Sequence, residues 1–585
     1  MPHTGMAWFS PMADVDSNKP EVPLVNVQID GEWHQFPKGT RMIEACREAG
    51  KEVPHYCYHP KLTSPGNCRM CLVEMGMPPR SRPGDAPPEK DEDGFLPIGW
   101  MPRPAIACAN TVAENMGIRT DSDLTKQCRE GVMEFLLINH PLDCPICDQA
   151  GECRLQEFSV EHGTGGSRFR EEKVHKPKNV DIGPRIRLDD ERCIMCSRCI
   201  RFMDEVADDP VLGFTERGSH TVLSVHPGKE LDSNYSLNTV DICPVGALTS
   251  NDFRFSMRVW FLKETKSIDV SCGTGCNITI HSRENRVHRI TPRDNAEVNS
   301  SWMPDSHRLN FHHIDGPNRL TAPMIREGTK HREVGWTAAF ERFRERVSGF
   351  APEETAVIAS GRMTNEELYL TKKLVQALEA KYCDIVPRME TSDGYLIAAD
   401  RNPNTEGAKL ILKLGKPGEK LAEIREGVLS GKIRCLLVLG DDATEGGFDS
   451  SDLYKAECLI TLGMQTSDSA QASDVVFAGA SWAEKRGSMI NAQGRLQRLN
   501  AAISVVGQCR DDWEVLRDMR AQVTGTNGLY GVDEVFRAMA KEIPDFEGLS
   551  LGKIGDLGVP LVNTGVRVPL LDREAERRAK GLIVG

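Results

Sequence analysis

The sequence predicts a multidomain chain in which α+β domains are followed by an α/β region. Its 585 residues are several times the roughly 100–200 residues expected per domain. Of its 19 cysteines, 13 lie between Cys46 and Cys243 in close, irregular clusters. Beyond about residue 320, apolar strand-like runs alternate with helix-like stretches, a pattern typical of a largely parallel sheet covered by helices.

The composition is that of a folded protein and excludes some classes of partner. With 72 Lys and Arg against 85 Asp and Glu, the net charge is −13, which argues against binding nucleic acid. The longest apolar runs fall far below the roughly 18 residues of a membrane span, so we expect contact with a membrane only through other subunits. Residues 1–20 show no secretory signal, and in a reducing compartment clustered cysteines are more often metal ligands or redox groups than disulfides.

The first domain is predicted to open with a β-hairpin and a helix. Residues 25–36 alternate between apolar and polar side chains on both sides of Asp30-Gly31, a dipeptide that favours a two-residue turn. The segment 41–50 then shows helical spacing of apolar residues, and Cys46 is expected in the core of that helix.

Two later segments complete the expected elements of the cysteine-rich half. Residues 77–104 hold eight prolines, so we expect a long surface insertion without strand or helix. Residues 124–140 predict an amphipathic helix that ends before Pro141, with Cys128 and Phe135 on its apolar stripe and Cys128 in the core.

In the second half, strands are expected at residues 355–361, 435–440 and 457–463, with helices between them. No G-x-G-x-x-G motif follows any of these strands, so the sequence gives little support to a dinucleotide site.

The first cysteine constellation comprises Cys57, Cys68, Cys71 and, beyond the proline-rich insertion, Cys108. Four thiolates suit a [2Fe–2S] cluster, and the preceding hairpin and helix resemble the β-grasp fold of [2Fe–2S] ferredoxins. A structural zinc ion is the alternative, since it also uses C-x2-C spacing.

The second constellation comprises His140, Cys144, Cys147 and Cys153. One imidazole and three thiolates could hold a tetrahedral zinc ion or a [4Fe–4S] cluster with one histidine ligand, and the spacing leaves this choice open. In a third interpretation, His140 only caps the preceding helix.

The third constellation comprises Cys193, Cys196 and Cys199, followed by Cys243-Pro244. Bacterial ferredoxins use C-x2-C-x2-C-x3-C-P, with the fourth cysteine serving a second cluster. Here Met203 stands at that fourth position, so the pattern favours a single [4Fe–4S] cluster closed by the remote Cys243. Cys272 and Cys276 form a further pair, but two thiolates cannot fill such a cluster, and we interpret them as packing residues.

The order of these motifs resembles the large iron–sulfur subunit of the peripheral arm of NADH:quinone oxidoreductase, respiratory complex I. The resemblance covers residues 22 to 525. It implies one [2Fe–2S] cluster and two [4Fe–4S] clusters on the twelve residues of the three constellations. It further implies electron relay between a flavin/NADH-binding subunit and quinone-proximal iron–sulfur subunits, at the cytoplasmic side of the bacterial inner membrane.

The same resemblance implies a division into domains. They are a [2Fe–2S] ferredoxin-like domain, a [4Fe–4S] segment with one histidine and three cysteine ligands, a ferredoxin-type [4Fe–4S] domain, a small domain, a region similar to molybdopterin oxidoreductases, and a tail. Their expected bounds are 22–117, 118–160, 180–255, 265–321, 322–525 and 526–585, respectively.

Two further sites of the wider family are expected to be degenerate. Some relatives bind another [4Fe–4S] cluster through four cysteines; here Asp269 replaces the first, and the last falls within Trp-Met-Pro-Asp at residues 302–305. Where catalytic molybdopterin enzymes carry a Cys or selenocysteine ligand, residues 388–390 read Arg-Met-Glu, although Cys383 lies nearby. No molybdenum cofactor is expected.

Other functions remain open from the sequence. An NAD-linked formate dehydrogenase or a hydrogenase could use the same electron-input modules, and a zinc-stapled scaffold could use the same cysteines for folding alone. Arg69, Arg198 and Arg201 lie beside the cysteines and could tune cluster potentials or be ordinary solvated charges.

Overall fold

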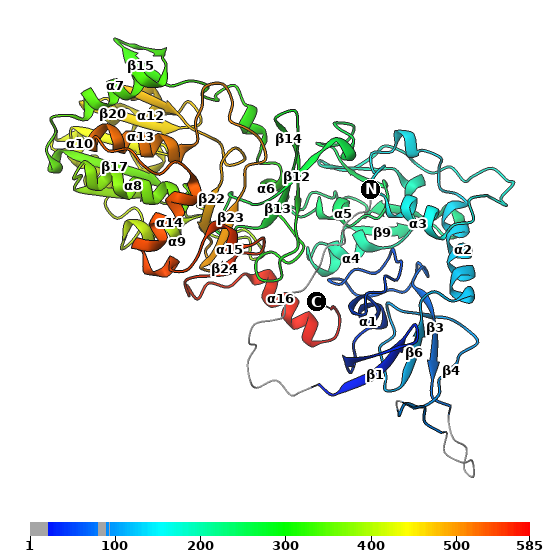
Figure 1. Cartoon of the computed structure of the whole chain (residues 1–585). Coiled ribbons are helices and arrows are strands. Elements are labelled where there is room, and N and C mark those ends of the chain that lie inside the picture. The colour runs from blue at the N-terminus through cyan, green and yellow to red at the C-terminus, as the bar shows by residue number, and fades with distance from the viewer. Residues whose placement is uncertain (1–21, 80–88, 93, 585) are drawn as a thin grey trace.

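The computed structural model describes residues 22–79, 89–92 and 94–584, so residues 1–20, in which no secretory signal was recognised, lie outside the described part. Figure 1 shows an elongated molecule with the α/β region at one end and the cysteine-rich domains at the other. A three-stranded sheet formed by β12 (Lys263–Ile268), β13 (Asn277–Arg283) and β14 (Arg286–Pro292) lies between them. The C-terminal helix α16 (Pro569–Ala579) returns to the cysteine-rich end (Figure 1).

The first domain is a mixed sheet of order β2-β1-β6-β3-β4, with β5 paired to β3. The expected hairpin is confirmed: β1 and β2 are antiparallel, and Asp30 and Gly31 both have positive φ, as its tight turn requires. The expected helix is also confirmed, and Cys46 on it is fully buried. The elements are β1 (Leu24–Ile29), β2 (Glu32–Pro37), α1 (Met42–Glu48), β3 (Leu72–Met77), β4 (Gly99–Trp100), β5 (Ala105–Ile106) and β6 (Met116–Arg119).

The proline-rich insertion is not wholly irregular, so that prediction is wrong for part of it. Residues 99–100 form β4 and pair with Gly76 and Met77 at the sheet edge. The Arg119 guanidinium lies 3.8 Å from the centre of the Trp100 ring, a cation–π contact that fixes this short strand. Residues 80–88 and 93 lie outside the described residues.

The helix α2 (Asp123–Leu137) forms as expected, but it buries a different face. Its buried positions are Thr125, Arg129 and Met133, spaced one turn apart, whereas Phe135 is 80% exposed. Cys128 is only half-buried, so its assignment to the core is wrong. The helix ends before Ile138, three residues earlier than Pro141 would require. Lys173 Nζ donates hydrogen bonds of 2.8 Å to the carbonyls of Leu137 and Ile138, and these bonds satisfy the C-terminal carbonyl groups of the helix.

The next segments carry two of the cysteine constellations on short elements. A small antiparallel sheet of order β11-β8-β7 and a β9–β10 hairpin surround helix α4, and the α4 residues Phe202 and Met203 are fully buried. The elements are η1 (Cys144–Ile146), α3 (Arg154–His162), β7 (Val180–Gly183), β8 (Ile186–Leu188), η2 (Asp190–Arg192), α4 (Arg198–Glu205), β9 (Leu212–Thr215), η3 (Gly218–His220), β10 (Val222–Val225), α5 (Asn238–Asp241) and β11 (Leu248–Ser250).

The small domain that follows is an antiparallel sheet of order β12-β13-β14, with the short helix α6 beside it. Its elements are η4 (Val259–Phe261), β12 (Lys263–Ile268), β13 (Asn277–Arg283), β14 (Arg286–Pro292), α6 (Asp305–Arg308) and η5 (His312–Asp315).

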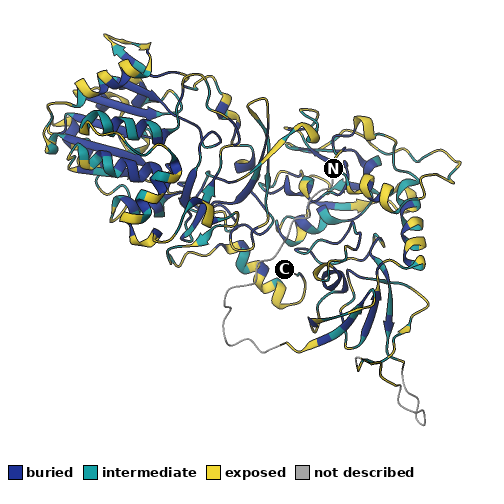
Figure 2. Cartoon of the chain, viewed as in Figure 1, coloured by how far each residue is buried: buried dark blue, intermediate teal, exposed yellow. Residues whose placement is uncertain are grey.

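The α/β region is built on a seven-stranded sheet of order β16-β15-β21-β20-β19-β17-β18. Strands β17 to β21 are mutually parallel, which confirms the prediction, and β15 and β16 add an antiparallel edge. The central strands are buried on both faces (Figure 2). The elements are β15 (Met324–Glu327), β16 (Lys330–Glu333), α7 (Trp336–Val347), η6 (Pro352–Glu354), β17 (Thr355–Ser360), α8 (Asn365–Ala377), β18 (Tyr382–Val386), α9 (Thr405–Leu412), α10 (Leu421–Leu429), β19 (Cys435–Leu439), η7 (Ala443–Gly446), α11 (Ser450–Leu453), β20 (Cys458–Gly463), α12 (Asp468–Ala472), β21 (Val475–Ala478), β22 (Gly487–Ile490), β23 (Arg495–Leu499) and α13 (Asp512–Thr524).

The last sixty residues divide between the two ends of the molecule. The elements α14 (Val532–Glu542), η8 (Pro544–Phe546), α15 (Leu551–Ile554) and β24 (Val559–Pro560) stay with the α/β region, where β24 pairs with β23. Residues 566–584, here called the C-terminal strap, contain α16 (Pro569–Ala579) and cross to the cysteine-rich end. There Arg577 pairs with Glu205, and Val584 N–H donates to the Pro60 carbonyl at 2.8 Å.

A buried carboxylate fixes the strap. Glu574 is 2% exposed and accepts hydrogen bonds from Ser300 Oγ at 2.7 Å and from Trp302 Nε1 at 3.0 Å. Lys61 Nζ lies 3.6 Å from the same carboxylate. The strap therefore joins the first domain to the small domain through one buried side chain.

Replacing Glu574 with alanine should destabilise the chain by about 3 kcal/mol, because it removes the acceptor shared by the buried Ser300 hydroxyl and Trp302 indole N–H. Glu576→Ala, on an exposed position of the same helix, is the matched control and should change little. Urea unfolding followed by tryptophan fluorescence measures both. Equal midpoints for the two variants would contradict the role given to Glu574.

Candidate metal centres

The four thiols of the first constellation converge. Cys57, Cys71 and Cys108 are buried and Cys68 is half-buried, and the thiol of Cys57 contacts those of Cys68 and Cys108. Cys108 also contacts Cys71, so its position beyond the insertion does not separate it from the others. The contact with Cys57 acts to lower the pKa of Cys108, but the contact with Cys71 and burial outweigh it and raise that pKa to about 11. Such thiols ionise when a metal binds, and four of them fit a [2Fe–2S] cluster.

Two arginines of α4 hold this loop against the third constellation. Arg201 donates to the carbonyls of Cys57 and Cys196, and Arg198 donates to those of Tyr58 and Ile242. Both guanidinium groups therefore join the Cys57 loop to the other cysteine loops, and they are not ordinary solvated charges. Arg69 is exposed and makes no comparable link among the described residues.

In the second constellation, His140 has a feature that its helix does not explain. Its Nδ1 is buried and has no hydrogen-bond partner among the described residues, as expected for a nitrogen kept available for a metal. Burial, assisted by Lys173 and Arg192, lowers the pKa of His140 to about 4, so the ring is neutral and able to ligate. Cys144 and Cys147 both act on the pKa of Cys153, which burial raises to about 11.

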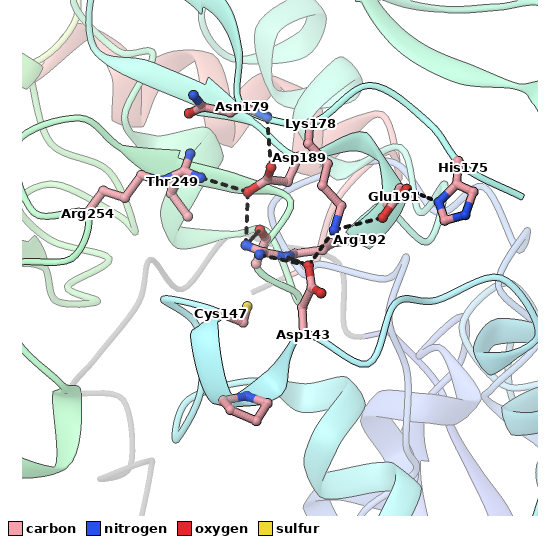
Figure 3. A network of polar contacts seen from close by, with 12 residues as sticks. Asp143, Cys147, His175, Lys178, Asn179, Asp189, Glu191, Arg192, Thr249 and Arg254 are labelled. Atoms are coloured by element: carbon pink, nitrogen blue, oxygen red, sulfur yellow. Dashed lines mark hydrogen bonds and ion pairs between the residues drawn. The ribbon is translucent and has the colours of Figure 1, made fainter. Parts of the chain in front are cut away.

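An ionic network fixes the loop that carries these donors (Figure 3). The buried Arg192 donates to Asp143 at 3.0 Å and to Asp189 at 2.9 Å, and Arg254 donates to the same Asp189 oxygen at 3.0 Å. Lys178 binds Asp143 at 2.8 Å. Although burial opposes ionisation, Lys178 and Arg192 hold the pKa of Asp143 below its ordinary range. Asp143 directly precedes Cys144, so the network anchors the second constellation to the domain of the third.

The third constellation surrounds a cavity. Cys193, Cys196, Cys199 and Cys243 all line it, together with apolar side chains such as Leu223 and Val245. Met195 and Ser197 have positive φ, which lets the short loop wrap around the space. Four thiols around an apolar cavity fit a [4Fe–4S] cluster. Met203, at the position where a fourth local cysteine would lie, is instead fully buried in the core.

One apolar cluster connects the three constellations. Tyr56, Cys57, Met133, Phe158 and Cys196 belong to its buried part. Further candidate ligands pack against it, and they come from all three constellations: Cys68, Cys153, Cys193 and Cys243.

The third constellation lies next to each of the other two. Cys68 acts electrostatically on Cys196. On the other side, Cys153 Sγ lies 3.9 Å from the Pro244 carbonyl oxygen, and Gly246 packs directly against the Cys147 sulfur. The third constellation therefore lies beside both of the others, although it comes last of the three in the sequence.

The pair Cys272 and Cys276 is fully buried, and two further donors lie near Cys272. Asp269 and His307 are joined by a hydrogen bond of 2.7 Å and form a group with Cys272. The sequence singled out Asp269 but not His307. His307 lies in α6, three residues after Pro304, and its closeness to the degenerate cluster motif at residues 302–305 was the signal that could have identified it.

Family comparisons match the described regions in order. Residues 23–123 match a 2Fe-2S iron-sulfur cluster binding domain. Residues 129–168 match the NADH-ubiquinone oxidoreductase-G iron-sulfur binding region, and residues 183–249 match the ferredoxin-like domain of NADH-quinone oxidoreductase subunit 3. Residues 262–312 match the NADH-ubiquinone oxidoreductase NDSU1/NuoG-like, 4Fe-4S domain. Residues 319–392 and 391–522 match molybdopterin oxidoreductase. The expected order of modules is confirmed.

Individual relatives extend this likeness over nearly the whole chain. The G-type subunit of NADH-quinone oxidoreductase from Rickettsia conorii is 30% identical over 90% of this chain and 92% of its own length. The 78 kDa subunit of NADH-ubiquinone oxidoreductase of Neurospora crassa is 31% identical over 84% of this chain and 80% of its own length. The chain belongs to this family of NADH-quinone oxidoreductase subunits. Its counterpart in Rickettsia felis is 42% identical over 61% of this chain but only 49% of its own length.

In this member of the NADH-quinone oxidoreductase family, the molybdopterin-like region offers a poor metal ligand set. Arg388 forms a two-pronged ion pair with Asp441 at 2.6 and 2.8 Å, and Met389 is exposed. Cys383 lies within strand β18, where burial raises its pKa to about 12. These residues do not fit a metal-bound pterin. No helix in the described ranges is long and apolar enough to cross a bilayer.

Gly246 yields a direct test of the second constellation. A methyl group at this position would overlap the Cys147 sulfur, so Gly246→Ala should displace that thiol. We expect iron content to fall by about four atoms per chain, the content of one [4Fe–4S] cluster, with the other clusters retained. Gly131→Ala, which has open space around its Cα, is the control. Unchanged iron in Gly246→Ala would exclude Cys147 as a ligand.

Proposed function

We propose that this chain relays electrons within an NADH:quinone oxidoreductase, from a flavin/NADH-binding subunit towards the quinone site. It would do so through one [2Fe–2S] and two [4Fe–4S] clusters. The observation that carries the proposal is the single apolar cluster that receives thiols from all three constellations. The proposed ligands are Cys57, Cys68, Cys71 and Cys108 for the [2Fe–2S] cluster, His140, Cys144, Cys147 and Cys153 for one [4Fe–4S] cluster, and Cys193, Cys196, Cys199 and Cys243 for the other.

When bound, iron–sulfur clusters supply one-electron carriers whose potentials depend on ligands, hydrogen bonds and exposure. The protein's own residues set those conditions. Tyr56 and Phe158 keep water out of the space between the first and second constellations, and their rings meet edge to face at 5.4 Å between centroids. Arg198 and Arg201 fix the backbone around the first and third.

Arg192 sets the electrostatic conditions at the second constellation. Its guanidinium acts on the Cys147 thiol and is itself fixed by Asp143 and Asp189. Since a cation beside a thiolate favours the more negative state of a cluster, Arg192 supports reduction there. No acid, base or nucleophile is needed for this function.

The place of the third constellation beside both of the others supports a route from the first to the third and then to the second. Exposed apolar side chains are present near the second constellation, namely Phe135, Leu142, Ile146 and Val160. Exposed apolar surface of this kind marks contact with other proteins. We propose that neighbouring iron–sulfur subunits dock near this end and that the chain lies at the cytoplasmic side of the bacterial inner membrane, held there through the complex. The negative net charge argues against a nucleic-acid partner.

Anaerobic purification followed by metal analysis and electron paramagnetic resonance during stepwise reduction tests the proposal. We expect about ten iron atoms per chain, from one two-iron and two four-iron clusters, and signals of three centres. Zinc in place of iron would support the scaffold alternative and refute electron relay. Stoichiometric molybdenum or tungsten would instead favour an NAD-linked formate dehydrogenase.

The variant His140→Cys tests the histidine ligand. It should retain the cluster but lower its potential, because a thiolate adds one negative charge where the imidazole is neutral; the shift should be on the order of 100 mV. Potentiometric titration measures it. His162→Cys, a half-buried histidine at the end of α3, is the control and should leave the potential unchanged. If both variants keep the original potential, His140 is not a ligand.

A further inference from the structure

The small domain contains a buried set of donors that the proposed relay does not use. Asp269, Cys272 and His307 are 4%, 0% and 8% exposed, and they contribute one carboxylate oxygen, one sulfur and one ring nitrogen. These three atoms lie within 4.8 Å of one another. Asp269 directly follows β12, Cys272 lies in the loop before β13, and His307 belongs to α6. Three separate segments therefore converge on one small space.

The donor set does not fit the [4Fe–4S] cluster that the matched family domain at 262–312 implies. Such a cluster is held by four donors, mostly thiolates, and this segment offers only Cys272 and Cys276. Pro304, in the place of the last cysteine, has no donor atom. Asp269, in the place of the first, is hydrogen-bonded to His307 at 2.7 Å and to the Ser271 N–H at 3.0 Å.

A single metal ion requires a different arrangement of ligands. Zinc is bound tetrahedrally by sulfur, nitrogen and oxygen donors at about 2.0–2.3 Å, so its ligands lie roughly 3.6 Å from one another. The three donor atoms lie within 4.8 Å of one another, so small side-chain shifts bring them to that spacing. The hydrogen bond between His307 and Asp269 accounts for those two groups, and Cys272 Sγ lies 3.9 Å from the Leu396 carbonyl oxygen. Neither contact requires the sulfur to lie beside the other two donors.

We propose that Asp269, Cys272 and His307 bind one zinc ion in place of the lost cluster. The mixed oxygen, nitrogen and sulfur set matches the borderline-soft character of Zn²⁺. The ion has no redox role, so this site would be a structural cross-link that ties the end of β12, the Cys272 loop and α6 together. Such a cross-link is independent of electron relay.

The zinc environment of the intact complex, purified anaerobically, tests this. Metal analysis should find stoichiometric zinc in addition to iron. X-ray absorption at the zinc edge should show one sulfur neighbour at about 2.3 Å, with nitrogen or oxygen completing the shell, if Cys272 is the only thiolate. Zinc misloaded into an iron–sulfur site would show at least three sulfurs, and that result, like an absence of zinc, would overturn the proposal.

Variants identify the ligands. Asp269→Asn retains a hydrogen-bonding side chain of the same shape but removes the anionic donor, so it separates metal binding from the contact with His307. This variant, Cys272→Ser and His307→Gln should each lose most of the zinc while iron remains unchanged. Cys509→Ser, at a buried cysteine that is not part of this donor group and whose thiol binds the Leu320 carbonyl, is the control and should keep its zinc. Full zinc retention in Asp269→Asn and Cys272→Ser would overturn the assignment.

Discussion

A single apolar cluster that must receive thiols from three parts of the chain is the constraint on which the structure depends. Cys57, Cys153 and Cys196 reach it from different elements, so those elements must pack together before this apolar cluster is complete. Backbone N–H and C=O groups buried near such a cluster still need hydrogen-bond partners. Arg198 and Arg201 supply them to carbonyls on both sides of the contact, which explains why long, charged side chains lie beside buried sulfur.

The sequence was sufficient to predict those parts of the sites whose residues lie close together in the chain. Cys193, Cys196 and Cys199 lie within seven residues, so their spacing alone brings the donors together. His307 meets Asp269 across 38 residues, and only the packing of α6 against the sheet decides that contact. The hydropathy pattern also predicted the wrong buried face for α2. There Arg129 is buried and donates to the Leu72 carbonyl, while Phe135 faces outward. Tertiary contacts override local preference in both cases.

The α/β region matches the molybdopterin oxidoreductase family, yet Arg388, Met389 and Cys383 do not fit a metal-bound pterin, which agrees with the general independence of fold and function. It still contributes to the small domain. Gln497, on β23, donates to the Gly275 carbonyl at 2.8 Å, and Asn491 donates to the Thr274 carbonyl at 3.0 Å. Side chains of the α/β region therefore hold the loop between Cys272 and Cys276.

The C-terminal strap has a consequence for biosynthesis. A ribosome delivers residues 566–584 long after residues 60 and 61, whose carbonyl groups they bind. The ion pair between Arg577 and Glu205 cannot form until residue 577 has been synthesised. Iron and sulfide donors thus have access to the nascent first domain before the strap reaches it, and the strap binds only after the α/β region has been made.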